Sequence, residues 1–150
     1  MDKSRLIGLL ERVERSAFEI PWTYEMLDGS LDETARIGLT DVQGRLLEIK
    51  NLNDSTLSVD SEVDISGFYL ARLGLEYTEL LRIAIRPEFR RRGIARTLMS
   101  DLAGYGRVLL EVSTNNPAAR ALYESAGYTT IARRKSYYSD GSDCIVMEKP

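Results

Sequence analysis

The chain has 150 residues, 43% of them hydrophobic and 29% charged, which suits one domain with its own core. It contains no histidine and a single cysteine, Cys144. Catalysis by Ser–His or Cys–His pairs is therefore excluded, no metal site is expected, and a general base must be a carboxylate or, less commonly, tyrosine or lysine. The net charge of −3 argues against a nucleic-acid surface. Without a long apolar segment or a signal-peptide core, we expect a cytoplasmic protein outside the membrane.

The first part of the chain predicts two helices followed by two strands. Apolar residues at helical spacing predict a helix over residues 3–16, and Thr23 begins a short second helix that Gly29 ends. Two strands follow, one on each side of a turn: residues 35–40 and 45–50. A polar loop over residues 51–64 comes next, and it carries a local excess of acidic side chains: Asp54, Asp60, Glu62 and Asp64.

The rest of the chain alternates strands with helices. We expect two antiparallel strands over 65–73 and 77–85, then a helix over 93–103. A strand over 107–113 and a helix over 116–127 follow, and two strands over 128–138 and 143–149 close the chain. In the strand over 77–85, simple alternation puts Glu79, Leu81, Ile83 and Ile85 on one side and Leu80, Arg82 and Ala84 on the other. The order α-α-β-β-β-β-α-β-α-β-β predicts an α/β fold over residues 1–150, with a mixed sheet flanked by helices.

The start of the helix over 93–103 has the chemistry of an anion site. Arg90, Arg91 and Arg92 precede Gly93, and no Ser, Thr, Asp or Asn stands just before it to accept the free backbone N–H groups. The macrodipole adds partial positive charge there, and Gly93 with Ala95 allows close approach of a phosphate. The alternative interpretation is a solvated basic turn.

These residues resemble the pyrophosphate-binding pattern [Q/R]-x-x-G-x-[G/A] of GNAT-family acetyltransferases, after a strand and at the start of a helix. The resemblance implies the GNAT acyl-CoA N-acyltransferase fold, with a mixed, largely antiparallel sheet, and acetyl-CoA as co-substrate. It implies that the strand backbone at Ile83, Ala84 and Ile85 holds the pantetheine arm and the acetyl carbonyl. It also implies that the phosphates lie on the following loop and first helical turn: Arg90, Arg91, Arg92, Gly93, Ile94, Ala95, Arg96 and Thr97.

A second pattern strengthens the resemblance. Asn116, Ala119, Tyr123, Gly127 and Tyr128 fit the GNAT pattern N-x2-A-x3-Y-x3-G-[F/Y], and helical spacing puts the first three on one face. The resemblance implies that Asn116 contacts the cofactor arm and that Tyr123 lies near its sulfur. The alternatives are a plain helix cap for Asn116 and a core aromatic for Tyr123.

Glu111 is the candidate general base. It stands among apolar residues in Val108–Val112, where burial would raise the pKa of its carboxyl group. In RimI-type GNAT enzymes, which this segment resembles, the glutamate of an L-E-V strand is the base and the tyrosine at the position of Tyr123 is the acid. The alternative is a Glu111 side chain in solvent, and Glu79 is a rival base.

Both ends of the chain also resemble RimI-type enzymes. Residues 17–22 are similar to their A-F-x-x-P-W segment and residues 133–138 to their R-R-x-Y-Y segment, which together wall the peptide groove. The resemblance therefore implies contacts with substrate from Trp22, Tyr137 and Tyr138. These aromatic side chains also suit core or edge packing.

The expected activity is acetyl transfer from acetyl-CoA to the N-terminal α-amine of a protein, and the resemblance points to a ribosomal protein. Two alternatives remain. The acidic loop suits a small-molecule acetyltransferase acting on a polyamine or amino-sugar, and the third possibility is a non-catalytic module that binds acyl-CoA. The oligomeric state and the first residue of the acceptor stay open.

Overall fold

The computed structural model describes residues 2–47 and 63–150. Its elements follow the predicted order: α1 (Lys3–Ala17), α2 (Tyr24–Ser30), β1 (Ala35–Asp41), β2 (Leu46–Leu47), β3 (Ile65–Leu73), β4 (Thr78–Ile85), α3 (Ile94–Leu102), β5 (Val108–Ser113), α4 (Pro117–Ser125), β6 (Thr129–Arg134) and β7 (Cys144–Lys149). Two 3-10 turns, η1 (Pro87–Phe89) and η2 (Ala103–Tyr105), flank α3. The predicted second half of the strand over 45–50, and most of the acidic loop, lie outside the described residues.

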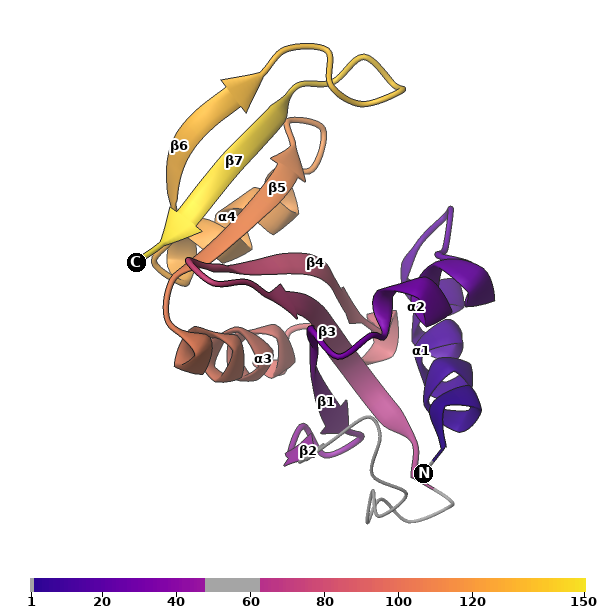
Figure 1. The fold of residues 1–150 in the computed structure, drawn as a ribbon. Helices are drawn as coiled ribbons and strands as arrows, with labels where there is room; N and C mark the ends of the chain where they lie inside the picture. Colours follow the sequence, from indigo (N-terminus) through magenta and orange to yellow (C-terminus); the bar gives the residue numbers. More distant parts are fainter. Residues whose placement is uncertain (1, 48–62) are drawn as a thin grey trace.

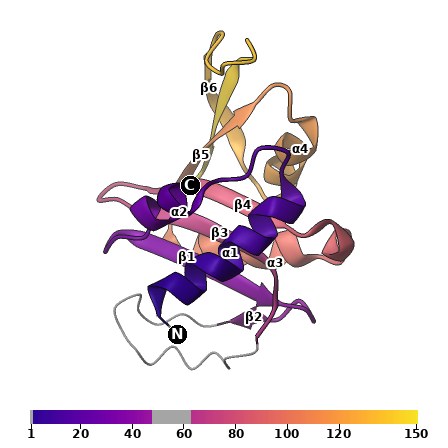
Figure 2. The same ribbon diagram turned by 90° about the vertical axis from the view of Figure 1, so that its right-hand side faces the viewer.

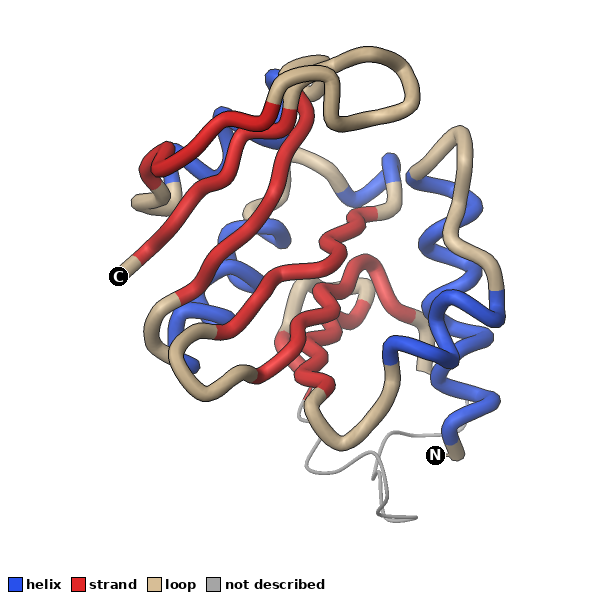
Figure 3. The backbone as a smooth tube through the Cα atoms, turned by 45° about the horizontal axis from the view of Figure 1, so that its top comes forward, coloured by secondary structure: helices blue, strands red, loops and turns tan. Residues whose placement is uncertain are grey.

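Within the described residues, seven strands form one sheet in the order β2-β1-β3-β4-β5-β7-β6, in which β4 and β5 are the parallel pair. The other strand pairs are antiparallel. The fold class is therefore the predicted mixed, largely antiparallel α/β sheet. Figure 1 and Figure 3 show α1 and α2 on one side of this sheet and α3 on the other.

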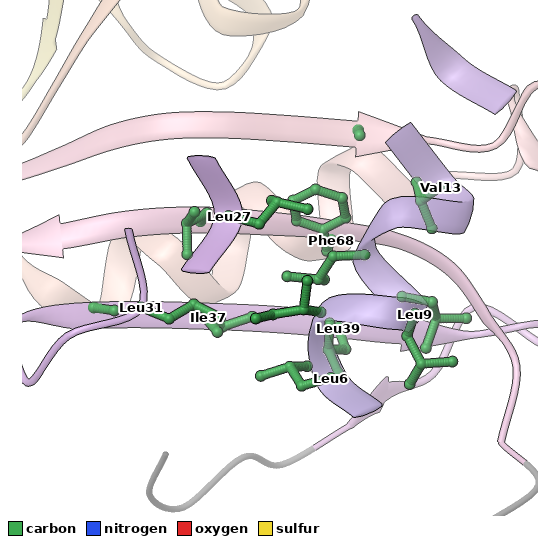
Figure 4. Close-up of a cluster of buried hydrophobic side chains, with 14 residues drawn as sticks. Leu6, Leu9, Val13, Leu27, Leu31, Ile37, Leu39 and Phe68 are labelled. Carbon is green, nitrogen blue, oxygen red and sulfur yellow. The ribbon is translucent and has the colours of Figure 1, made fainter. Parts of the chain in front are cut away.

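Two hydrophobic clusters, one on each face of the sheet, hold these layers together. The first joins α1 and α2 to β1 and β3 (Figure 4), and the buried ring of Phe68 lies among the leucines of both helices. Figure 2 shows α1 crossing the strands on this face. The second cluster joins α3, β5 and α4, and includes Leu98, Leu110 and Tyr123. Burial of this apolar surface fixes where the helix ends lie relative to the strands.

A β-bulge at Leu81 changes which face the residues of β4 occupy. Leu80 pairs with Ala71 of β3 and Arg82 pairs with the preceding Leu70, so Leu81 is the extra residue. Simple alternation is therefore wrong across the whole strand. Leu80 packs in the cluster of α3 together with Ile83 and Ile85, whereas Ala84 packs in the cluster of α1.

Element ends differ from the predictions where packing or capping overrides local signals. Helix α2 runs through Gly29 to Ser30, because its end is set by the backbone bond of Leu31 to Asp28. The final two strands are shorter than predicted: β6 ends at Arg134, and residues 135–143 form a wider loop. None of the helices in the described ranges is long and apolar enough to cross a membrane.

Candidate active site

The centre of the sheet opens between β4 and β5. These parallel strands pair only at Thr78–Leu80 with Val108–Leu110, and beyond that point they separate (Figure 1). A cavity of about 640 Å³, which we call the central cavity, lies between them and is lined by β4 from Leu80 to Ile85. The backbone edge of β4 that faces β5 is thus left without strand pairing over Leu81–Ile85, and it can bind an extended polar chain.

A second cavity, of about 540 Å³, lies at the start of α3, and we call it the α3 cavity. The two cavities share four lining residues and so adjoin: Ile85, Arg90, Ala95 and Leu122. Together they form a continuous path from the helix start to the space between the strands. A long ligand with a charged head and a narrow arm fits this shape better than a compact metabolite does.

The backbone at the start of α3 is arranged as an anion site. Gly93 is the N-cap with φ 78° and ψ 10° and has no side chain to cap the helix. Arg91 also has positive φ, 64°, a conformation that a residue with a side chain seldom adopts. Left-handed residues beside a helix start turn successive N–H groups toward one point, where an anion is stabilised.

The predicted phosphate-binding residues fall into two groups. Six line the α3 cavity: Arg90, Arg91, Gly93, Ile94, Ala95 and Arg96. Arg92 lies outside that lining, with its guanidinium 5.4 Å from the Phe89 ring, and the Thr97 hydroxyl donates to the Gly93 carbonyl at 3.1 Å. Ile94 is buried, so its side chain anchors the helix and its backbone N–H is the group available to an anion.

The central cavity brings together most of the other predicted site residues. Ile83, Ala84 and Ile85 line it from β4, Glu111 from β5, and Asn116 and Tyr123 from α4. The Asn116 side chain also caps α4 by accepting from the Ala119 N–H at 3.2 Å, so the cap interpretation holds whether or not a ligand binds there.

Tyr123 has the properties of a proton donor. Its side chain is 7% exposed, and burial, partly offset by the positive charge of Arg82, raises the pKa of its hydroxyl to about 12. A phenol in this environment keeps its proton at neutral pH, so the hydroxyl is present as a hydrogen-bond and proton donor. Neighbouring Tyr128 packs against it with ring centroids 6.1 Å apart.

Glu111 is less buried than the apolar sequence around it predicts. Its side chain is 32% exposed and lies 3.6 Å from the Arg134 guanidinium. The reason is the alternation of β5, in which Val108, Leu110 and Val112 face the core while Glu111 faces the other way. The expectation of a desolvated carboxylate is therefore wrong, although Glu111 does line the cavity.

The rival base, Glu79, lies at the closed end of the strand pair. It sits beside Leu109 in the parallel register, and its carboxylate is 3.9 Å from Arg72. The lining of the central cavity begins one residue later, at Leu80. Of the two carboxylates considered, the structure brings only Glu111 to the cavity.

The three aromatic side chains predicted to contact the substrate lie in different surroundings. Tyr138 lines the central cavity, and burial, followed by its contact with the Cys144 thiol, raises the pKa of its hydroxyl above the usual value. Tyr137 packs edge-on against Tyr138 at 5.1 Å but is 48% exposed and lies outside the lining. Trp22 packs against the α1 cluster, which favours its core interpretation.

One charged lining residue, Arg82 of β4, was missed by reasoning from the sequence. It lies beside Ala17 and Phe18, which belong to the segment that resembles A-F-x-x-P-W and line one side of the central cavity. Arg82 forms a two-fold ion pair with the fully buried Glu14 of α1. The available signal was Glu14 itself, which shares the apolar face of α1 with Leu10 one turn earlier.

Comparison with known proteins identifies the class to which this fold and site belong. The model of the acetyltransferase (GNAT) domain family matches residues 53–130, and the chain therefore belongs to this family of acetyltransferases. The predicted GNAT fold and the predicted enzyme class, an N-acetyltransferase, are confirmed. No group of side chains suited to hold a metal ion occurs among residues 2–47 and 63–150.

The relatives narrow the resemblance to the RimI type. The [ribosomal protein bS18]-alanine N-acetyltransferase of Salmonella typhimurium is 29% identical over 148 residues, which cover 93% of this chain and 87% of that protein. The N-alpha-acetyltransferase RimI of Mycobacterium tuberculosis is 39% identical over 88 residues, which cover 53% of this chain and 55% of that protein. The crystal structure of the ribosomal-protein-S18-alanine N-acetyltransferase from Escherichia coli superimposes with a TM-score of 0.75 at 24% identity, covering 100% of this chain and 90% of that one.

Proposed function

We propose that this protein transfers the acetyl group of acetyl-CoA to the N-terminal α-amine of an acceptor protein. The observation that carries the proposal is the continuous path formed by the two cavities. It begins at an arginine-rich helix start with free N–H groups and ends between Glu111 and Tyr123. A diphosphate fits the first part of this path, and an extended pantetheine arm fits the unpaired edge of β4.

Each site residue has a defined task in this proposal. Arg90, Arg91 and the start of α3 bind the diphosphate, and the β4 backbone from Ile83 to Ile85 orients the thioester carbonyl by N–H donation. Glu111 accepts the proton of the attacking amine, directly or through water. Tyr123 donates its proton to the departing thiolate; its raised pKa of about 12 means that the hydroxyl carries this proton at neutral pH.

The α-amine is the acceptor that a modest base suits best. Its pKa of roughly 7.7–8.0, against about 10.4 for lysine, leaves a useful neutral fraction at pH 7. Glu111, partly exposed and beside Arg134, is such a modest base. The names of the relatives support a ribosomal protein beginning with alanine as acceptor. The feature that suggested a polyamine or amino-sugar, the acidic loop, lies almost entirely outside the described residues.

The test measures thiol release from acetyl-CoA with three acceptors and a control without acceptor. The acceptors are a short peptide with a free N-terminal alanine, the same peptide blocked at its N-terminus but carrying a lysine, and spermidine; the control is buffer alone. If only the peptide with the free N-terminal alanine is turned over, the result supports the proposal. Turnover with spermidine only would replace it by the small-molecule alternative, and binding of coenzyme A without any turnover by the non-catalytic one.

Matched variants then test the roles of Glu111 and Tyr123. Glu111→Gln and Tyr123→Phe should each lower turnover by about 10²-fold or more, the usual contribution of a positioned acid or base. Glu79→Gln and Tyr128→Phe change the same residue types outside the cavity and should leave turnover near that of the parent. Unchanged turnover at every pH in both cavity variants would refute the assignment.

A further inference from the structure

A buried carboxylate joins three parts of the chain beside the central cavity. Glu14 of α1 is 0% exposed. Its Oε1 accepts from Arg82 Nε at 2.7 Å, and its Oε2 accepts from Arg82 Nη2 at 2.8 Å and from the backbone N–H of Trp22 at 3.0 Å. One side chain therefore connects α1, strand β4 and the segment between α1 and α2.

Aromatic rings cover the other partner of this ion pair. The Arg82 guanidinium carbon lies 3.7 Å from the centre of the Phe18 ring and 5.1 Å from that of Trp22. Its side chain is 20% exposed. A planar guanidinium suits this position because it can bind a carboxylate with two N–H groups and stack on a ring at the same time. The bulge at Leu81 places Arg82 on the face of β4 where α1 lies.

The pair is better explained by geometry than by stability. Burying two charges costs several kcal/mol, and replacing a buried pair by apolar residues is often neutral or stabilising, so such a pair is weak support for a stabilising role. Here, however, both sides of the contact reach the central cavity: Arg82 lines it, as do Ala17 and Phe18 at the end of α1. The pair thus sets the distance between β4 and the cavity wall formed by Ala17 and Phe18.

We propose that Glu14 and Arg82 form a positioning pair, which holds the Ala17–Phe18 wall against β4 so that the acceptor lies in line with the site of acetyl transfer. This inference rests on the proposed function, since the ligand positioned is the acceptor. None of Glu14, Arg82, Ala17 and Phe18 lines the α3 cavity, where the diphosphate is proposed to bind. The link between the two regions is Arg90, which lines both cavities and whose guanidinium donates to the Ala17 carbonyl at 3.4 Å. The pantetheine arm is proposed to bind backbone groups of β4, and the Arg82 side chain is engaged by Glu14, so coenzyme A binding is expected to depend less on the pair than acceptor binding does.

The proposal is tested with three variants and a control. Arg82→Lys keeps the charge but loses the two-fold geometry, and Glu14→Gln keeps an acceptor but removes the charge. The double variant E14M/R82M replaces both charges by apolar chains of similar length, leaves no unpaired buried charge and is expected to fold. The control, Arg15→Met, breaks the exposed pair with Glu11 on the same helix.

We expect the variants to weaken binding of the acceptor and to leave binding of coenzyme A nearly unchanged. In folded Arg82→Lys and E14M/R82M, the KM for the acceptor peptide should rise about tenfold or more, because small misplacements of reactants are costly, while the dissociation constant of coenzyme A changes by less than about twofold. Trp22 is the only tryptophan of the chain. Its fluorescence should be quenched more strongly by acrylamide in these variants than in the parent and the control.

Two results would overturn the proposal. The first is an acceptor KM and a Trp22 quenching both equal to the parent's in folded E14M/R82M. The second is a loss of coenzyme A affinity as large as the loss for the acceptor, which would indicate a general structural role. If no α-amine acceptor is turned over at all, the proposed function fails separately, and the Trp22 quenching still decides whether the pair holds the wall.

Discussion

Replacing Gly93 by alanine tests the anion site at α3 with a predictable magnitude. Gly93 has φ 78°, and a Cβ built on it meets nothing within 4 Å, so the only cost is the left-handed backbone. For an L-residue that cost is roughly 1–2 kcal/mol. In a chain of this size the melting temperature should therefore fall by about 2–8 °C.

The same substitution should weaken binding of coenzyme A. If alanine relaxes toward negative φ to escape the strain, the first N–H groups of α3 turn away from the ligand, and each 1.4 kcal/mol lost corresponds to about a tenfold loss of affinity. Thermal melts and calorimetric titration with coenzyme A measure the two effects. Gly93→Asn should lose less, because asparagine tolerates the left-handed region.

Gly104→Ala provides the control for this experiment. A Cβ at Gly104 also meets nothing within 4 Å, and its φ is not in the left-handed range. The control should therefore melt within a degree or two of the parent and bind coenzyme A equally well. If Gly93→Ala behaved like Gly104→Ala in both measurements, the account of the helix start as a built anion site would be wrong.

Three further predictions concern stability and pH. Gly38→Ala should cost about 1–3 kcal/mol in urea denaturation, because its Cβ would lie 2.2 Å from the buried Tyr69 ring; an unchanged midpoint would contradict this. Tyr69→Phe removes the hydroxyl that donates to Asp101 at 2.5 Å and should cost about 1.5–3 kcal/mol in the same assay; stability equal to the parent's would contradict this. Burial raises the pKa of Tyr123 and of Tyr128 to about 12. Their neutral forms therefore stabilise fully below about pH 10, and this stability is lost as the pH rises through about 12. Tyr123→Phe should show a smaller decline between these pH values, and an equal decline would refute the assignment.

The order of elements could be predicted from the sequence because the local signals agree with one another. Asn116 and Pro117 mark the start of α4, and the arginines before Gly93 mark the start of α3, and each of these helices follows a strand rich in apolar residues. When capping, periodicity and turn residues agree in this way, the order of elements can be predicted from the sequence.

Three features of the site depend on contacts between distant residues, and the sequence alone could not settle them. The bulge at Leu81 arises from the pairing of β4 with β3, and it reverses the faces expected for the rest of the strand. The sequence left both a buried and a solvent-facing Glu111 open, and the structure favours the second because the helices leave this face of β5 partly uncovered. The ion pair of Glu14 with Arg82 spans 68 residues of sequence, and only the fold brings its partners together.

The brief pairing of β4 with β5 leaves a gap in the sheet that, in the proposed function, the pantetheine arm of the substrate would fill. Three residue pairs join two halves that each have further strands, and the edge of β4 beyond Leu80 has its polar groups facing a cavity. A pantetheine chain laid along that edge would act as a missing strand between the halves. Since a ligand that binds only the folded state stabilises it by mass action, at about 2.7 kcal/mol when present at 100 times its dissociation constant, the resistance of this protein to heat is expected to follow the supply of coenzyme A.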